Sequence, residues 1–523
     1  AGDGHDFVIG GTDGKEILGG TGNDFIHGGD GIDALFGGSG DDWVEGGGRF
    51  DYIAGDNGDI FFESPILGHD VLNGGQGDTD YDADSGDDIM FAGAGIQKNI
   101  GMWGFDWVIH KDSTVSAYSD LNQLVFDTEP LKVLRDRFSD VEALSGWDRD
   151  DVLRGDDRGN DPDAGEEEQL NANNALSQAG VDRINGLREM LDYLVELPPE
   201  EGDLEAAIAF NAGNILLGGG GSDVIEGRGG DDYIDGAAWL NVRISIRDDA
   251  GNEIGTADGM TKVITGKSGV LAGTAESLTL DQAMFSRLLN PGQLHIVREI
   301  LYSKDENDID TAVYFGLADE YDIIENFDGT WTVSHTRFAG GGGTVTTFDP
   351  LDPDGLSTTR KIVSDGTDTL RNIDRVQFAD QVVWLIDRPA EGSVAISNMA
   401  PAEDEMLLAA ATVSDPNGTE FAVLSYAWQA LVAGEWVQVG TGQSFTPGDA
   451  EVGLALRVVV SFNDDMGNPE SLVSAVTAPV LNVNDAPTGL PQLNNASPSV
   501  GQVLIASTAM IADADGLVGV TFA

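Results

Sequence analysis

The sequence contains no cysteine, so no disulfide bond and no thiolate metal site can hold the fold together. Positive charge is also scarce: 27 Lys and Arg stand against 91 Asp and Glu, which gives a formal net charge of −64. This excess of negative charge argues against nucleic acid and anionic membrane surfaces as partners, and it destabilises the compact chain by self-repulsion. No run of about 20 apolar residues is present, so we expect no membrane span.

What the chain does contain is a repeat. Its first 63 residues are seven consecutive nonapeptides of the form G-G-x-G-x-D-x-U-x, in which U is apolar. The eighth column is apolar in every copy: Val8, Ile17, Ile26, Leu35, Val44, Ile53 and Phe62. The sixth column is Asp6, Lys15, Asp24, Asp33, Asp42, Asp51 and Ile60. A flexible Gly/Asp linker would not keep these columns in register. The chain opens inside this repeat without a cleavable signal, so we expect it to be part of a longer protein.

The repeat has a direct physical interpretation. The three residues after each Asp form a short strand whose middle side chain points inward, and the glycine-rich half turns tightly. Two nonapeptides then make one coil, and coils eighteen residues apart stack at roughly 4.8 Å. Aspartate carboxylates and backbone carbonyls meet between coils, and such hard oxygen ligands suit Ca²⁺. Bound Ca²⁺ would also offset part of the negative charge.

These nonapeptides resemble the RTX repeats of secreted bacterial proteins. The resemblance implies a parallel β-roll that folds when it meets calcium outside the cell, and export by a type I secretion machinery. Carried over by position, it implies that Asp6, Asp24, Asp33, Asp42 and Asp51 are metal ligands. Lys15 and Ile60 depart from the pattern, so their two turns are not expected to form full sites.

The repeat returns further along the chain. Register is kept at 83–91, at 145–153 and at 209–235, which adds Asp88, Asp150, Asp223 and Asp232 to the expected metal ligands. We interpret these segments as one roll interrupted by two excursions. Two independent rolls are the alternative.

The remaining segments change in character. We expect strands at 101–111 and 239–248, and helices at 129–144, 181–194, 280–290 and 291–301. Residues 310–386 look like strands again, and 387–485 show short alternating strands with an early Trp, as in immunoglobulin-like sandwiches. A second copy starts afterwards, because Asp415 in SDPNG and Asp513 in ADADG lie 98 residues apart.

The predicted fold class is therefore mainly β: a parallel β-roll with helical excursions, a β-rich α+β module and an immunoglobulin-like β-sandwich. The expected domains are a roll at 1–97, an excursion packing on it at 98–142, a roll continuation at 143–238 with a helical insertion at 160–208, an α+β module with a C-terminal β segment at 239–388, a sandwich at 389–485 and a truncated second sandwich at 486–523.

An ordered set of longer segments carries a second resemblance: GFDWVIHK, DVEALSGWDRDDVLRGDD, GNILLGGGGSDVIEGRGGDDYIDG, WLNVRIS and NPGQLHIVREIL. Over roughly residues 1–390 the chain is similar to the region that follows the catalytic domain in large secreted bacterial haem peroxidases of the animal type. The resemblance implies an upstream haem domain, which could pack against this region and oxidise Mn(II), aromatic or halide substrates. None of that family's catalytic helices is visible, so no catalytic or cofactor-binding residue is assigned, and haem is expected only with an upstream domain.

Three functions remain open at this level. The chain could be a non-catalytic calcium-binding tail for secretion, extracellular folding and spacing, it could be a portion of a peroxidase, or its sandwich array could belong to an adhesin.

The seventh column makes a separate prediction. Every second copy is aromatic there, in the row Phe7, Phe25, Trp43 and Phe61. This column points away from the interior of the roll, and four stacked aromatics in water would form a large apolar patch. We therefore expect a cover over this face, either the 98–142 excursion with Trp103, Phe105 and Trp107 or an upstream domain.

Overall fold

The structure is a computed structural model that describes residues 1–57, 68–126, 134–158, 174–191, 210, 213–304, 307–338, 340, 344–348 and 357–517, with the backbone alone at 346–348 and 357–361. The chain divides into two compact units, Ala1–Leu385 and Ile386–Ala523. Each unit is described by itself. Within the described ranges, no helix combines the length and the apolar character needed to cross a membrane.

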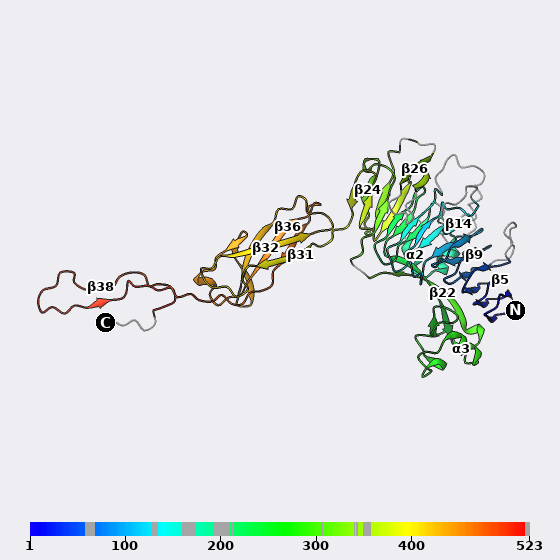
Figure 1. The fold of residues 1–523 in the computed structure, drawn as a ribbon, viewed down its shortest axis with the longest axis horizontal. Helices are drawn as coiled ribbons and strands as arrows, with labels where there is room; N and C mark the ends of the chain where they lie inside the picture. The colour runs from blue at the N-terminus through cyan, green and yellow to red at the C-terminus, as the bar shows by residue number, and fades with distance from the viewer. Residues whose placement is uncertain are drawn as a thin grey trace, which may run out of the picture. The chain divides into compact units, whose positions relative to one another are not determined.

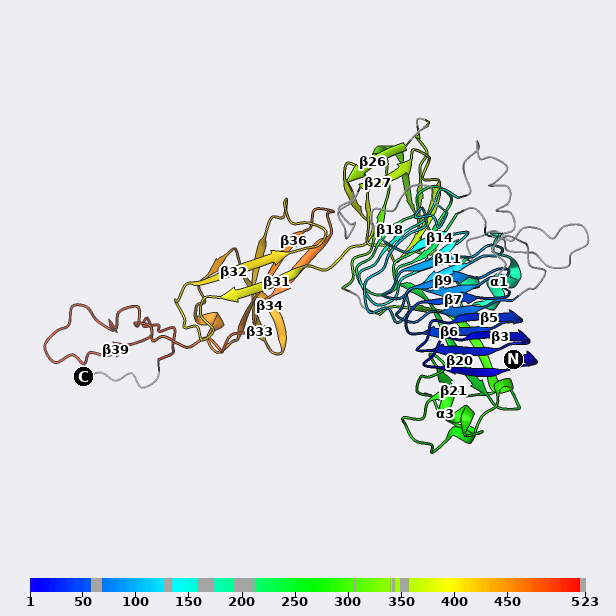
Figure 2. The same cartoon turned by 45° about the vertical axis from the view of Figure 1, so that its right-hand side comes forward.

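The first unit is a roll of short parallel strands stacked like rungs (Figures 1 and 2). One wall is a single twelve-stranded sheet. Its ten parallel strands are, in order, β2 (Phe7–Gly11), β4 (Phe25–Gly29), β6 (Trp43–Gly47), β8 (Val71–Asn73), β10 (Ile89–Phe91), β12 (Trp107–Ile109), β15 (Ala143–Ser145), β17 (Ile215–Leu217), β19 (Tyr233–Asp235) and β28 (Thr367–Arg371). Two antiparallel strands, β25 (Trp331–Ser334) and β24 (Asp322–Glu325), finish this wall.

The opposite wall consists of two sheets. The first contains β1 (Gly2–Asp3), β3 (Glu16–Thr21), β5 (Ala34–Ser39), β7 (Asp51–Ala54), β9 (Thr79–Asp82), β11 (Gln97–Ile100) and β14 (Arg137–Ser139). The second contains β13 (Tyr118–Asp120), β16 (Val152–Arg154), β18 (Val224–Glu226), β23 (Thr311–Val313), β29 (Arg375–Gln377) and the antiparallel β30 (Val382–Trp384). A separate hairpin pairs β26 (Thr344–Phe348) with β27 (Ser357–Lys361).

The eighth column of the repeat forms the interior between the walls. Ile26, Leu35, Val44 and Ile53 are completely buried in one core cluster, and Ile17, nearer the end of the roll, is half-buried against it. Strand partners in the first coils are eighteen residues apart, as Phe25↔Trp43 shows, which confirms the predicted mainly β fold built on a parallel roll. Phe62 lies outside the described residues.

The long wall of the roll runs without a break through the segments expected as excursions. The single wall continues from β2 to β28 and includes strands from 98–142 and from 310–385, so there is one roll, not two. The prediction of a helix at 129–144 is wrong for the part of this segment that the structure describes, because 137–139 and 143–145 are strands of the two walls. The segment at 101–109 keeps Gly101, Gly104, Asp106 and Val108 in repeat register, which is why it folds as another turn.

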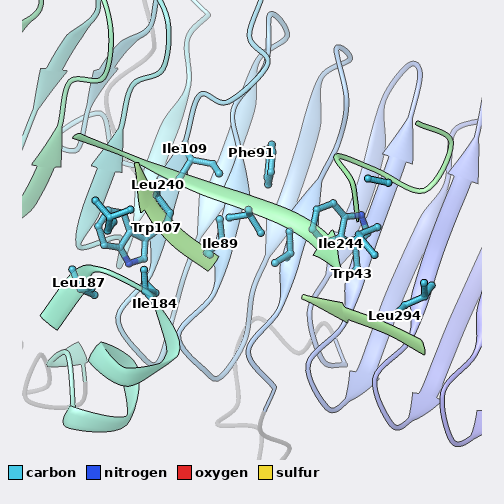
Figure 3. Packing of buried hydrophobic residues seen from close by; sticks show 14 of the residues in the cluster. Trp43, Ile89, Phe91, Trp107, Ile109, Ile184, Leu187, Leu240, Ile244 and Leu294 are labelled. Atoms are coloured by element: carbon cyan, nitrogen blue, oxygen red, sulfur yellow. The ribbon is translucent and has the colours of Figure 1, made fainter. Parts of the chain in front are cut away.

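A three-stranded antiparallel sheet covers the outer face of the long wall. It contains β21 (Glu253–Ala257), β20 (Ala238–Arg247) and β22 (Leu294–Tyr302), with helix α3 (Leu280–Phe285) attached. Alternate residues of β20 are completely buried, namely Leu240, Val242, Ile244 and Ile246. Figure 3 shows β20 lying across the strands of the wall, with Leu240 and Ile244 close to the row that contains Trp43, Ile89 and Trp107.

The aromatic row is therefore covered, but not by the expected segment. Phe25 and Trp43 are 1% and 0% exposed, and Phe105 and Trp107 belong to the same cluster as further members of the covered face. The cover is residues 238–302, together with the short helices α1 (Gln178–Arg183) and α2 (Leu187–Met190). Phe61 lies outside the described residues.

Three expected helices differ from the structure. The segment at 181–194 forms two short helices, because Gly186 between them has φ 90°; its residues after 191 lie outside the described ranges. The helix at 280–290 is present but ends at Phe285. The segment at 291–301 begins with a 3-10 turn at Pro291–Gln293 and continues as β22, because pairing along the whole length of β20 outweighs the helix-start signal of Asn290 and Pro291.

The second unit contains two facing antiparallel sheets. One contains β31 (Glu391–Ile396), β32 (Leu407–Ser414) and β35 (Ser444–Phe445); the other contains β34 (Glu435–Thr441), β33 (Ser425–Val432), β36 (Leu456–Asn463) and β37 (Pro469–Val473). Both contribute to one core, where Trp428 is completely buried with its ring 5.6 Å from that of Phe445. A two-residue pair, β38 (Gln492–Leu493) with β39 (Ala506–Ser507), follows.

The cover makes a stability prediction. The Trp43 indole N–H donates to Glu45 Oε1 at 2.7 Å, and the Met260 amide of the cover donates to the same oxygen at 2.8 Å. Trp43→Ala should therefore lower the free energy of unfolding by about 3–5 kcal/mol in calcium-containing buffer, as for other large buried aromatics. Val270→Ala, at a residue of the cover that is 57% exposed, is the control. Urea denaturation checks this, and equal midpoints for the two variants would show that the cover does not depend on the aromatic row.

Candidate metal centre

The sixth column forms a ladder of hydrogen bonds along the long wall. The backbone amide of each sixth-column residue donates to the carboxylate of the sixth-column residue in the next coil. Asp6 donates to Asp24 Oδ1 at 2.7 Å, Asp24 to Asp42 at 2.6 Å and Asp42 to Asp70 at 2.8 Å. The ladder continues through Asp88, Asp106 and Glu142, and it resumes from Asn214 to Asp232 and Asp368.

A second ladder follows the opposite wall, in two parts. In the first, the Lys15 amide donates to Asp33 at 2.6 Å and the Asp33 amide to Asp51 at 2.9 Å. Thr79 and Gln97 then take the column, because Asp51 pairs with Thr79 and Thr79 pairs with Gln97. The Gln97 amide donates to Asp136 at 2.8 Å. The second part runs through Asp151, Asp223, Asp310 and Asp374 with distances of 2.8–2.9 Å.

Only one oxygen of each carboxylate is used by these ladders. Among the residues that the structure describes, the other oxygen, Oδ2, is buried without a hydrogen-bond partner in Asp24, Asp33, Asp42, Asp51, Asp70, Asp88, Asp106, Asp223, Asp232 and Asp368. A buried, charged oxygen without a hydrogen-bond partner costs free energy. Because the same oxygen is unpaired in coil after coil, one kind of partner should satisfy all of them.

The first-column glycines make room beside these free oxygens. A Cβ on Gly37 would lie 2.4 Å from Asp42 Oδ2 and 2.4 Å from the carbonyl oxygen of Gly55 in the next coil. A Cβ on Gly218 would likewise lie 2.3 Å from Asp223 Oδ2 and 2.6 Å from the Gly236 carbonyl. Carboxylate and carbonyl oxygens from neighbouring coils therefore converge where no side chain fits. This all-oxygen set, free of nitrogen and sulfur donors, matches what Ca²⁺ prefers, so the residues present fit that ion.

The electrostatics of the buried carboxylates favour a cation as their partner. Burial raises the pKa of Asp42 to about 8 and that of Asp223 to about 10; amide hydrogen bonds oppose the rise, and neighbouring carboxylates add to it. Burial likewise raises the pKa of Asp24 to about 6. For Asp70, Asp88 and Asp232 the pKa lies well above the ordinary value for the same reason. The calcium-free site thus favours protonated carboxylates.

The structure places most of the residues expected from the sequence in the ladders. Asp24, Asp33, Asp42, Asp51, Asp88, Asp223 and Asp232 are all buried ladder members. Asp6 is half-buried in the outermost coil and contributes its amide. Asp150 is one residue out of register: Asp151 is the ladder member, whereas Asp150 is exposed and accepts from the Ser222 amide. The repeat there begins at Gly146 and not at Ser145, because Leu153 is the buried eighth-column residue. Ile60 lies outside the described residues.

Several ladder residues were not predicted. They are Asp70, Asp106, Asp136, Glu142, Asp151, Asp310, Asp368 and Asp374. All of them precede an apolar residue by two positions, as Asp136 precedes Phe138 and Asp374 precedes Val376. This short D-x-U pattern without its glycines is the signal that could have found them.

A separate group of carboxylates lies in the second unit. Glu403, Asp449 and Asp485 bring ligand oxygens within 4.8 Å of one another, and Glu403 is buried. The Val483 amide donates to Glu403 at 3.3 Å. Hydrogen bonding to Asp449 raises the pKa of Glu403. This group has no part in the ladders.

Comparison with known families agrees with this geometry. Four copies of the RTX calcium-binding nonapeptide repeat match the chain, at residues 1–35, 18–53, 36–59 and 208–238. No curated protein matches the chain. The matched segments contain the start of both ladders and the pair Asp223 and Asp232, so this part of the molecule is a calcium-binding RTX region, a type of repeat typical of proteins secreted by bacteria.

The departure at Lys15 is testable. Its amide joins the ladder, but its side chain brings an ammonium group, which bonds to the Asp13 carbonyl, to a column of carboxylates. Lys15→Asp should raise the number of bound calcium ions by about one, because the number of oxygen ligands tunes the site. Calorimetric titration measures this. Unchanged stoichiometry and affinity would mean that the first coil lacks the remaining ligands.

The raised pKa values predict a pH dependence. Folded Asp24 and Asp42 hold protons up to about pH 6 and about pH 8, whereas unfolded aspartate titrates near 4. The folded state thus binds more protons in this window, so the stability of the calcium-free chain falls as pH rises through it. Calcium needs ionised carboxylates, so its affinity rises over the same range.

We therefore expect urea midpoints in EGTA to decrease from about pH 5 to about pH 8, while the gap between calcium and EGTA widens. Far-UV circular dichroism follows both. A calcium-free chain that gains stability over this range would contradict the assignment of buried, unpaired carboxylates.

Proposed function

We propose that this chain is the calcium-triggered folding region of a large secreted bacterial protein. The observation that carries the proposal is the row of buried Oδ2 atoms without a hydrogen-bond partner among the described residues. The proposed ligands are the expected Asp24, Asp33, Asp42, Asp51, Asp88, Asp223 and Asp232, the newly found Asp70, Asp106 and Asp368, and Asp6 at the outer edge. Asp151 replaces Asp150 in this set. When bound, calcium supplies positive charge between coils.

The charge of the chain supports a role for calcium as a switch. A net charge of −64 with many buried carboxylates opposes compaction until cations bind. A chain of this kind stays extended where calcium is scarce, which suits export through a type I secretion machinery, and it folds where calcium is plentiful, outside the cell. Binding free energy is then folding free energy.

The second unit suggests a spacer. Its two facing sheets and buried Trp428 support the proposal of an immunoglobulin-like sandwich. The expected second copy from 486 onward would make an array that acts as a spacer. Binding of a surface or carbohydrate by this array would favour the adhesin alternative.

The parent protein is proposed to be a haem peroxidase of the animal type, on the resemblance over residues 1–390. In this proposal the haem and the catalytic residues belong to an upstream domain. A Soret band in the purified chain would instead assign haem binding to this region. Loss of the band in a chain that lacks the roll would place the haem site in the roll.

Folding should depend on calcium in the first unit alone. At about pH 7.5 in EGTA, we expect β6, β10 and β17 to exchange their amide hydrogens rapidly, while β33 and β36 stay protected. With calcium, both sets should be protected. Hydrogen exchange with mass spectrometry resolves the two units in one full-length sample. Equal protection of the roll in EGTA and in calcium would refute calcium-triggered folding.

A further inference from the structure

The second column of the repeat changes character at one place in the roll. In the first six copies it is glycine, and Gly38, for example, has φ 110°. In the seventh copy the column is Asp56, and in the coil stacked on it the column is Asp84. The pairing of Ala54 with Asp82 places the two aspartates in neighbouring coils at the same position. Because they stand in the second column, Asp56 and Asp84 are not among the calcium ligands proposed for the sixth column.

Asp56 is a buried carboxylate. It is 1% exposed, and neither Oδ1 nor Oδ2 has a hydrogen-bond partner of normal geometry, although the Ser85 amide lies close enough to lower its pKa. A buried ionised group in this state is strongly disfavoured unless a cation accompanies it.

The surroundings of Asp56 add negative charge. Asp84 is also 1% exposed, and its Oδ2 accepts from the Asn57 amide at 2.9 Å, which ties the two coils together at this point. The carboxylates of Asp42, Asp70 and Asp88 are close enough to interact electrostatically with Asp56. The charges that act on Asp56 are therefore those of carboxylates.

We propose that Asp56 and Asp84 hold an additional calcium ion, beside the ladder, at a column that the nonapeptide pattern fills with glycine. Two carboxylates from neighbouring coils supply charge, and Ca²⁺ completes its shell of six to eight oxygens flexibly. Mg²⁺ fits less well, because it keeps several waters and a strict octahedron, whereas Asp56 is almost fully buried. The site rests on the proposed function, since the same folding event would load it and the ladder.

The alternative is a shared proton. Burial, with the Asp84 charge as a further cause, raises the pKa of Asp56 to about 8. A protonated Asp56 facing an ionised Asp84 would be a structural hydrogen-bonded pair, with no metal. The two arrangements differ in what they lose when Asp56 becomes Asn, because only the metal site loses an ion.

The test is a count of bound calcium in the full chain at about pH 7.5, by equilibrium dialysis followed by metal analysis. Asp56→Asn should bind about one ion fewer than the native chain. The control is Asp30→Asn, which removes the same charge from an exposed position in another glycine-rich turn. The control should bind as many ions as the native chain.

Stability gives a second readout. Asp56→Asn removes a repulsive carboxylate, so it should raise the pH at which the β signal is lost in EGTA and lower the urea midpoint in saturating calcium. This reversal of sign is not expected from a simple packing defect, which would lower both values. Asp84→Asn should show the same reversal, and Asn tolerates the positive φ of 71° at that residue.

The outcomes separate the inference from the function on which it rests. A native chain that binds no calcium overturns the proposed function. A native chain that binds several ions, with Asp56→Asn binding equally many at equal affinity, overturns the additional site and leaves the ladder intact. If Asp56→Asn fails to fold in calcium by circular dichroism, the count for Asp84→Asn decides by the same criteria.

Discussion

One backbone amide donating to one aspartate carboxylate in the next coil is the interaction on which the roll depends. The bond fixes the register of neighbouring coils, because only residues in the same column can form it, as in the 2.6 Å contact from Asp24 to Asp42. It also fixes the orientation of the carboxylate, so that the second oxygen points toward the glycine-rich turn. The hydrogen bond alone offsets little of the burial cost of a charge. The fold is therefore arranged around charges that its own residues do not neutralise.

Apolar packing inside the roll and under its cover supplies stability that the hydrogen-bond ladders do not. Inside the roll, one small column of Ile, Leu and Val cannot bury much surface per coil, so stacking adds stability only as coils accumulate. Outside, the aromatic row would remain in water without a cover, and β20 supplies it with Leu240, Val242 and Ile244. The shared acceptor Glu45, bonded by both Trp43 and Met260, ties this cover to the roll. The cover thus depends on the coils below it being in register.

Sequence alone was enough where the pattern was dense. Seven copies predicted the roll, its inward column and the first ladder residues, because three columns kept one register. The pattern was not enough where glycines were lost: Asp310, Asp368 and Asp374 follow no G-G-x-G, and only tertiary pairing shows that they extend the ladders. The helix signal at Asn290–Pro291 was real but local, and the antiparallel partner β20 determined the strand that follows. A cover was predictable from the aromatic row, whereas its identity was not, since residues 238–302 are far from Trp43 in sequence.

The long insertions show why such a roll tolerates interruption. Asp310 bonds to Asp374 across 64 residues and Asp232 to Asp368 across 136, with distances of 2.8 and 2.9 Å that match those across eighteen. The ladder keeps its register on both sides of these insertions, one of which contains the folded cover at 238–302. A flexible insertion in a turn adds chiefly loop-closure entropy. That entropy grows slowly, by roughly 0.6 kcal/mol for each doubling of loop length. A calcium ion bound across the junction would offset a cost of that size, so insertions can be kept wherever the D-x-U triplet survives on both sides.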